Sequence, residues 1–273
     1  MSPKKGMGVP TTHILKIPDP DHRGEAEHEA FAAELARQSG INAAFCSNGQ
    51  IADQDVLLIQ RFDRLVDNDG SVRRLHQEDF AQAAGLPANL KYQRRGNEGR
   101  RFDARSIGNI LAACAMPAIA REDFLKITLF NLLIGNNDNH AKNHALLYKV
   151  GTSPSLAPFY DIVPVQMVHG FTDEFAFKIG TASRPDELTF RDLEKFCIEI
   201  GIPEIGTPRL LGKVASETIS AVELASLNIP RNMRALDNLI GQQAEQLNEL
   251  LKLKLNLRQR DSHDVRGGGW QLS

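Results

Sequence analysis

The chain has 273 residues, of which 42% are hydrophobic and 24% charged, and its formal net charge is −2. That length can bury a sizeable core in one large or two small domains, and the near-neutral charge excludes a strongly basic nucleic-acid-binding surface over the whole chain. We expect a cytoplasmic protein outside the membrane, because the sequence has no apolar run of membrane-spanning length, no apolar signal-peptide stretch at its start, and only three cysteines, at unrelated spacings.

The first part of the chain alternates the signals of strands and of a helix. Strands are predicted at residues 11–17, 43–46 and 56–62, and a helix at 24–38. Gly40 lies just past the last residue of that helical pattern and marks its end. This order predicts a small α+β lobe over residues 1–66, with its boundary at the turn cluster of residues 67–70.

Residues 67–257 have mainly helical patterns. Helices are predicted at 106–115, 122–134, 191–200, 208–227 and 231–257, and strands at 144–148 and 175–179. These elements predict a second, larger lobe that is mainly helical. Residues 258–273 are polar and rich in glycine, so we expect a disordered tail there.

The segment of residues 94–101 has an unusual composition, with four arginines and two glycines among eight residues. The simpler interpretation is a solvated, mobile loop. The alternative is a positive collar near an acidic or nucleic-acid-bound substrate. We favour the solvated loop from the composition alone.

The most informative motif is a polar loop that contains Asp138 and Asn143, followed by Asp161 beyond an apolar strand. Protein kinases use this spacing for a catalytic base and two magnesium ligands. A triphosphate requires a hard cation held through oxygen atoms, and Asn143 and Asp161 have suitable ones. Asp138 could take or orient the proton of an acceptor hydroxyl. The pattern therefore predicts a phosphotransfer site.

A plain helix-to-strand loop is the alternative, because Asn, Asp and Gly are common turn residues. The position of the loop favours the site. It lies between the predicted helix at 122–134, which is apolar nearly all round, and the predicted strand at 144–148. Two buried elements would hold a polar loop rigidly, as chemistry requires.

Longer motifs surround this spacing. Residues 138–143 read Asp-Asn-His-Ala-Lys-Asn, and residues 158–161 read Pro-Phe-Tyr-Asp. On these motifs the chain resembles the kinase portion of the HipA family, the bacterial toxin kinases of type II toxin–antitoxin modules. Both motifs occur in that family, with a glycine usual at the position of Asn139.

The resemblance extends well beyond the catalytic loop. Residues 12–16 are similar to the family's strand that bears an ATP-contacting lysine. Residues 60–64 are similar to its hinge segment, where Glu is usual in place of Gln60. The matches follow the family's order from about residue 11 to at least residue 178.

The resemblance implies a protein kinase-like, two-lobed α+β fold that uses ATP and Mg²⁺. It implies that Asp138 is the catalytic base, that Asn143 and Asp161 are the magnesium ligands, and that Lys16 contacts the α- and β-phosphates. The residues implied to bind ATP are Lys16, Gln60, Arg61, Phe62, His140, Ala141, Lys142, Asn143, Tyr160 and Asp161.

Lys16 needs a partner if it lies on a half-apolar strand face. Glu27 and Glu29 on the predicted helix at 24–38 are the candidates, by analogy with the lysine–glutamate pair of protein kinases. The alternative is that both glutamates are solvated charges on a surface helix.

The implied function is transfer of the ATP γ-phosphoryl to a Ser or Thr of a protein, with an aminoacyl-tRNA synthetase as the possible target. A HipB-like antitoxin that binds DNA is the implied partner, and this chain would reach DNA only through it. A rival is a truncated or degenerate kinase that binds the antitoxin or another partner without turning nucleotide over. A small-molecule phosphotransferase is a third possibility, against which the matches outside the catalytic loop argue.

One departure from the family precedes the lysine strand. Relatives have a phosphate-covering loop of the type Ser-x-Ala-Gly-Ala-Gln-x-Lys there, and residues 1–10 contain none. Backbone amides of such a loop neutralise phosphate charge. We therefore expect a truncated small lobe, which is continued upstream, completed by another polypeptide, or left as a nucleotide-poor remnant.

Overall fold

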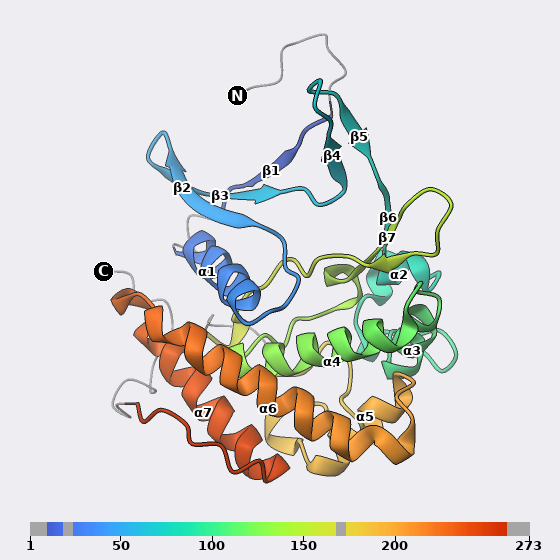
Figure 1. Cartoon of the computed structure of the whole chain (residues 1–273), viewed down its shortest axis with the longest axis vertical. Coiled ribbons are helices and arrows are strands. Elements are labelled where there is room, and N and C mark those ends of the chain that lie inside the picture. Colours follow the sequence, from blue (N-terminus) through green and yellow to red (C-terminus); the bar gives the residue numbers. More distant parts are fainter. Residues whose placement is uncertain (1–9, 19–23, 168–172, 261–273) are drawn as a thin grey trace.

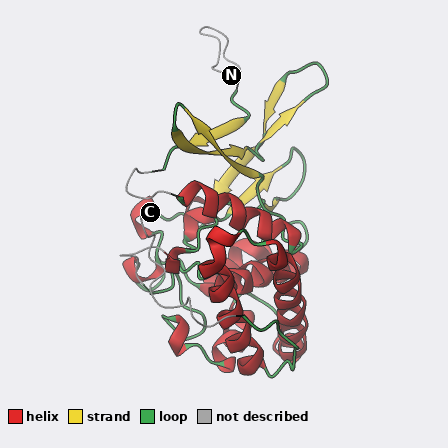
Figure 2. Ribbon diagram, turned by 90° about the vertical axis from the view of Figure 1, so that its left-hand side faces the viewer, coloured by secondary structure: helices red, strands yellow, loops and turns green. Residues whose placement is uncertain are grey.

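The computed structural model describes residues 10–18, 24–167 and 173–260. A small lobe made mostly of strands sits on a larger helical lobe (Figure 1), and the view turned by 90° separates strands and helices in the same way (Figure 2). The two-lobed α+β architecture predicted from the sequence is therefore confirmed. Within the described ranges, no helix combines the length and the hydropathy that crossing a bilayer requires.

The small lobe contains a three-stranded antiparallel sheet in the order β1-β3-β2, with helix α1 on one face. These elements are β1 (His13–Lys16), α1 (Glu25–Gln38), β2 (Cys46–Ile51) and β3 (Gln54–Gln60). Leu57 of β3 is fully buried against Ala26 and Ala30 of α1. The register pairs Lys16 with Leu57, so this packing brings Lys16 to the face that α1 covers.

Two details of the small lobe differ from the prediction. The strand expected at 43–46 begins only at Cys46, and Ala43 instead forms a single parallel bridge with Phe159. The turn expected at 67–70 joins β4 (Arg64–Val66) to β5 (Val72–Arg74), so the first residues after it are still in a strand.

The large lobe is built around α4 (Pro117–Ile134), which contacts α3, α6 and α7. The other helices are α2 (Phe80–Ala83), α3 (Ala104–Ala112), α5 (Phe190–Glu199), α6 (Thr207–Ala225) and α7 (Arg234–Leu251). A second sheet, in the order β6-β7-β8, lies at the junction with the small lobe. Its strands are β6 (His76–Asp79), β7 (Ala145–Tyr148) and β8 (Ser155–Leu156).

The apolar pattern of α4 correctly predicts a buried helix, but the predicted start of the helix is wrong. Eleven of its residues are buried, including Phe124, Leu129 and Phe130. The helix begins at Pro117, five residues before the predicted position. Proline at the first helical position already has the φ angle of a helix, and the amide hydrogen that it lacks would have no partner within the helix. The helix can therefore begin at Pro117, before the apolar pattern begins.

The strand predicted at 175–179 is wrong. This segment forms only an isolated bridge between Ile179 and Ala182. Its backbone pairs with loops instead: the amide of Ala176 donates to Asn137 at 3.0 Å, and the carbonyl of Ala176 accepts from Gln93 at 2.9 Å. The segment therefore braces the loop after α4 without belonging to a sheet.

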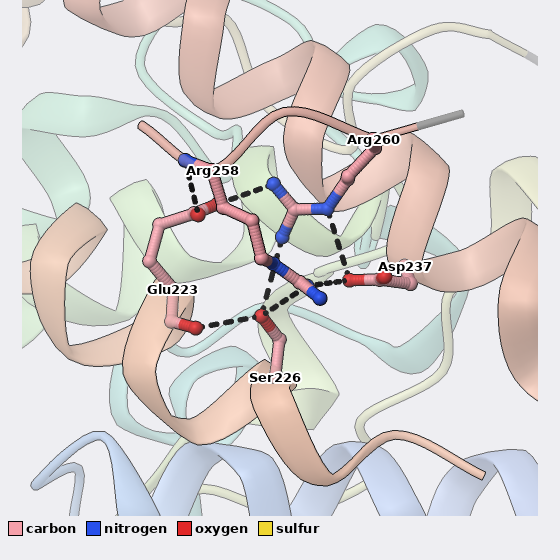
Figure 3. A network of polar contacts seen from close by, with 5 residues as sticks. All are labelled: Glu223, Ser226, Asp237, Arg258 and Arg260. Carbon is pink, nitrogen blue, oxygen red and sulfur yellow. Dashed lines mark hydrogen bonds and ion pairs between the residues drawn. The ribbon is translucent and has the colours of Figure 1, made fainter. Parts of the chain in front are cut away.

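The tail expected to be disordered from residue 258 is ordered at its start. Arg260 pairs with Glu223 at 2.8 Å and with Asp237 at 3.0 Å, and Arg258 also bonds Asp237 (Figure 3). Both arginines donate to the hydroxyl of Ser226 at 3.2 Å. These contacts fix the chain across α6 and α7, while residues 261–273 lie outside the described residues.

Candidate active site

The loop that follows α4 is held from several sides. Gly135 ends the helix with φ 68°, and a Cβ there would lie 2.9 Å from side-chain atoms of Gln166 and Leu239. Asn136 donates to Asn131 from its backbone at 2.8 Å and from its side chain at 2.9 Å. The chain therefore leaves the helix in a fixed direction, which determines where the next residues lie.

Asp138 is the accessible point of this loop. Between residues 131 and 141 it is the one residue that is not buried. The amide of His140 donates to its backbone oxygen at 2.8 Å. Burial and the neighbouring Asp138 carboxylate raise the pKa of Tyr92 to about 12, so the Tyr92 hydroxyl remains a donor at neutral pH. A carboxylate held in this way can accept or orient the proton of a hydroxyl group.

A second group of side chains joins the two lobes. Nζ of Lys16 lies 2.6 Å from Oε2 of Glu29 and 3.1 Å from Oδ1 of Asp161. Asn143 donates from Nδ2 to Oδ2 of the same Asp161 carboxylate at 3.0 Å. Residues from β1, α1, the 3-10 turn η3 (Ala141–Asn143) and the segment after β8 therefore meet at one point.

The backbone around Asp161 is also specific. Asp161 has φ 57°, which few residues other than glycine adopt, and such strain is often found at functional sites. Two residues earlier, Phe159 is fixed to the segment after α1, because its amide donates to Asn42 and its carbonyl accepts from Ala44, both at 2.8 Å. The positions of Asp161 and of the helix that carries Glu29 are therefore linked.

The pKa values of Lys16 and Glu29 are changed by different causes. Burial alone would lower the pKa of Lys16, but the carboxylates of Glu29 and Asp161 outweigh it and raise the pKa, so Lys16 stays charged. Burial raises the pKa of Glu29 to about 7, since its side chain is only 2% exposed and Lys16 offsets that cost only in part. Of the two candidate partners, Glu29 is the one that pairs with Lys16, and Glu27 instead accepts from Asn232.

His140 lies within the electrostatic influence of Asp138, the predicted base, and of Asp161, a predicted magnesium ligand. Burial lowers the pKa of His140, and the charge of Lys91 lowers it further, while the carboxylates of Asp138 and Asp161 each act in the opposite direction. Nζ of Lys91 lies 2.6 Å from Nε2 of the ring, which fits a neutral imidazole that accepts a hydrogen bond. Asp138 and Asp161 are therefore close enough to act on one imidazole.

The residues present fit a divalent cation. Asn143 uses Nδ2 on Asp161, and its Oδ1 is buried without a hydrogen-bond partner in the described part of the chain. A buried amide oxygen beside a carboxylate is a favourable donor set for Mg²⁺, which takes oxygen ligands and commonly binds through one or two carboxylates together with substrate phosphates. Asn143 and Asp161 could hold such an ion.

The backbone amides of the first two predicted hinge residues have partners of their own. The amide of Gln60 donates to Phe45 at 2.9 Å and the amide of Arg61 to Thr12 at 3.0 Å, so neither is available to a nucleotide base. The guanidinium of Arg61 binds the carboxylate of Asp63 through two hydrogen bonds.

Aromatic rings supply the apolar surface near this hinge. The ring centroids of Phe62 and Tyr160 lie 5.6 Å apart. Both rings pack on the small cluster of Ala145, Leu147 and Ala157. The hinge can therefore offer a nucleotide base apolar contact.

Two further predicted ATP-binding residues have other partners. Lys142 pairs with Asp79 at 2.7 Å, and its carbonyl accepts from the hydroxyl of Tyr160 at 2.7 Å. Ala141 is fully buried in the main core, where its amide donates to Lys91 at 3.1 Å. Sequence reasoning missed Lys91 and Tyr92, which lie beside the loop after α4 but in a segment without a motif.

Comparison with known proteins agrees with this arrangement. Residues 2–225 match the family model of the HipA-like C-terminal domain. The chain is 29% identical over 231 residues to the serine/threonine-protein kinase toxin HipA of Shewanella oneidensis, a match that covers 81% of this chain and 52% of that protein. It is 32% identical to Y4mE of Sinorhizobium fredii over 79% of this chain and 50% of that protein. The chain thus spans about half the length of these relatives.

Solved structures agree with the fold. HipA of Shewanella oneidensis, in its complex with HipB and operator DNA, superposes with a TM-score of 0.74 at 26% identity and covers 89% of this chain and 59% of that one. The Helicobacter pylori proinflammatory kinase CtkA, at 11% identity, covers 88% of this chain and 85% of its own with a TM-score of 0.52, which supports the kinase-like fold alone. The chain therefore belongs to the family of the HipA-like C-terminal domain.

Proposed function

We propose that this chain is the catalytic part of a HipA-type protein kinase, which transfers the γ-phosphoryl group of ATP to a Ser or Thr of a protein. The observation that carries the proposal is the position of Lys16 between Glu29 and Asp161, with Asn143 bonded to the same Asp161 carboxylate. A lysine–glutamate pair beside a metal-binding Asp and Asn is the arrangement that protein kinases use to hold ATP.

Each residue then has one role. Lys16, oriented by Glu29, binds the α- and β-phosphates, and Asn143 and Asp161 hold the ion. Mg²⁺ supplies positive charge to the phosphate oxygens when it is bound there. Phe62 and Tyr160 provide apolar surface for the base.

Asp138 acts on the acceptor. It receives the proton of the acceptor hydroxyl as the new bond to phosphorus forms and the bond to the β-phosphate oxygen breaks. The Tyr92 hydroxyl, whose pKa the neighbouring Asp138 carboxylate helps to raise, would orient that carboxylate. This divides the site into a nucleotide side at Asp161 and an acceptor side at Asp138.

The relatives suggest the biological setting. The solved complex of the Shewanella protein with HipB and operator DNA supports a HipB-like antitoxin as the partner of this chain, with DNA reached only through that antitoxin. In this setting the chain is a cytoplasmic toxin, and an aminoacyl-tRNA synthetase is the protein substrate that the family resemblance suggests.

Phosphate transfer tests the proposal. The purified chain is incubated with γ-labelled ATP, Mg²⁺ and candidate protein substrates, and phosphoserine and phosphothreonine are measured. We expect transfer by the wild type and by Asp69→Ala, which changes an exposed turn, and none by Asp138→Ala. Absence of transfer from the wild type under all conditions, or equal transfer by Asp138→Ala, contradicts the proposal.

A second candidate function is a module that binds the antitoxin without turning nucleotide over. The chain matches about half the length of its relatives, so the catalytic competence of this part alone needs its own test. Calorimetry with the antitoxin distinguishes the two functions. The module predicts binding that Asp161→Ala leaves intact in a chain that transfers no phosphate.

A further inference from the structure

The segment of residues 91–95 is fixed beside the catalytic loop. The carbonyl of Lys91 accepts from the amide of Ala141 at 3.1 Å, and the amide of Gln93 donates to Ala176 at 2.9 Å. Ala176 in turn donates to Asn137, which directly precedes Asp138. The side chain of Gln93 also accepts from the amide of Lys178 at 2.6 Å. The residues directly before segment 94–101, which composition alone suggested to be a mobile loop, are therefore fixed beside the acceptor side of the site.

Three cations gather on one aromatic ring in this segment. Nζ of Lys91 lies 5.0 Å from the centre of the Tyr92 ring, and Cζ of Arg94 and Arg95 lie 4.2 and 5.0 Å from it. Cation–π contact holds positive groups over a ring without neutralising them. The carboxylate of Asp138 is near enough to this ring to raise the pKa of the Tyr92 hydroxyl. The cations are therefore held at a defined place next to the proposed base.

Among the described residues, the carboxylates that act on this ring and its cations are Glu174 and Asp138, two against three cations. Glu174 is the one ion-pair partner of Arg94 in that part of the chain, at 3.7 Å. Nζ of Lys91 lies 2.6 Å from Nε2 of His140, and Lys91 forms no ion pair with any of the described residues. Arg95 is exposed and forms no ion pair with any residue of the described ranges. Like charges this close repel one another, so an additional anion would be bound favourably here.

The position of the cluster points to the acceptor and away from the nucleotide. Its backbone is bonded to Ala141 and, through Ala176, to Asn137, on either side of Asp138. The group that would hold the phosphates is instead Lys16, Asn143 and Asp161. We propose that Lys91, Arg94 and Arg95, arranged on Tyr92, bind acidic side chains that flank the acceptor Ser or Thr of the protein substrate. This inference rests on the proposed function and adds a substrate preference to it. Arginine in particular binds carboxylates through paired hydrogen bonds.

Binding of short peptides tests the inference without requiring catalysis. Two fluorescein-labelled peptides carry one Ser flanked on both sides by Glu or by Gln, and anisotropy gives their affinities for the whole chain. We expect the wild type to bind the Glu peptide at least about tenfold more tightly, as expected for hydrogen bonds to charged groups. The double variant Arg94→Gln/Arg95→Gln should lose this preference.

The matched control is Arg191→Gln/Arg209→Gln, which removes the same charge from two exposed helix positions and should keep the preference. With phosphate transfer as the readout, the cluster variant should lower kcat/KM for the Glu peptide and leave the KM for ATP unchanged. Equal affinity of the wild type for both peptides overturns the inference.

Two other results also overturn the inference. A parallel loss of ATP affinity in the cluster variant would assign the cations to the nucleotide. Tighter binding of a short single-stranded RNA than of the Glu peptide would assign them to nucleic acid. If the wild type transfers no phosphate at all but still prefers the Glu peptide, the kinase proposal fails and the anion site stands.

Discussion

The ionisation of Glu29 gives a prediction that depends on no ligand. Only 2% of this side chain is exposed. One of its carboxyl oxygens, Oε2, contacts Lys16, and the other, Oε1, has no hydrogen-bond partner among the described residues. Burial raises its pKa from 4.5 to about 7, against the opposing effect of Lys16. Glu29→Gln replaces the carboxyl by a neutral amide of the same shape.

The direction in which stability changes with pH follows from proton binding. Between pH 4.5 and about 7 the folded state binds this proton and the unfolded state does not, so the stability of the wild type falls as pH rises through that range. The difference between the two pKa values corresponds to a loss on the order of 3 kcal/mol. The Gln variant has no such proton, so its stability relative to the wild type should increase from pH 5 to pH 8.

Urea unfolding followed by circular dichroism at pH 5, 6, 7 and 8 measures this difference. The control is Glu27→Gln, the same change two residues away on α1, where the partly exposed carboxylate accepts from Asn232. Its stability relative to the wild type should not vary with pH in this way. The reasoning is refuted if Glu29→Gln differs from the wild type by the same free energy of unfolding at pH 5 and pH 8.

Three further changes test other parts of the structure. Arg260→Ala removes a guanidinium that is 7% exposed and should lower the free energy of unfolding by about 3 kcal/mol in urea titrations, whereas Arg209→Ala at an exposed position should change it little. Gly135→Ala places a Cβ at φ 68° and should cost about 1–2 kcal/mol in the same assay, and an unchanged midpoint would contradict the role given to this helix end. Tyr92→Phe removes the hydroxyl that neighbours the Asp138 carboxylate and should lower kcat about tenfold with the KM for ATP unchanged, while a change in that KM alone would place Tyr92 on the nucleotide side.

Much of the nucleotide side could be predicted because its residues occur in short motifs. The spacing of Asn143 and Asp161 in the sequence is enough to suggest that they meet, and the structure brings them together. The partner of Lys16 was narrowed to two glutamates by helical spacing. Only the packing of α1 on β3, which buries Glu29, separates it from Glu27.

Asp138 itself is part of a motif, but the residues around it could not be predicted in this way. Tyr92 reaches Asp138 because the backbone of residues 91–93 is bonded to Ala141 and Ala176, and such contacts leave no periodic pattern in the sequence. The strand predicted at 175–179 failed for the same reason, since its backbone pairs with loops rather than with a sheet.

The ordered start of the C-terminal tail depends on tertiary packing as well. Arg260 fills a space that the absence of a side chain at Gly241 leaves open, and its partners Glu223 and Asp237 come from two different helices. Local composition, which is polar and rich in glycine after residue 258, could not indicate these contacts.

The position of a bound divalent ion is the most direct test of the account. A crystal structure of the chain with a non-hydrolysable ATP analogue and Mn²⁺, which anomalous scattering locates, would place the ion relative to the side chains. We expect a manganese peak within ligand distance of Asn143 Oδ1 and the Asp161 carboxylate, with Lys16 on the phosphates and Asp138 facing the γ-phosphoryl group. A nucleotide and ion bound elsewhere, with Asn143 and Asp161 still bonded only to each other and to Lys16, would contradict it.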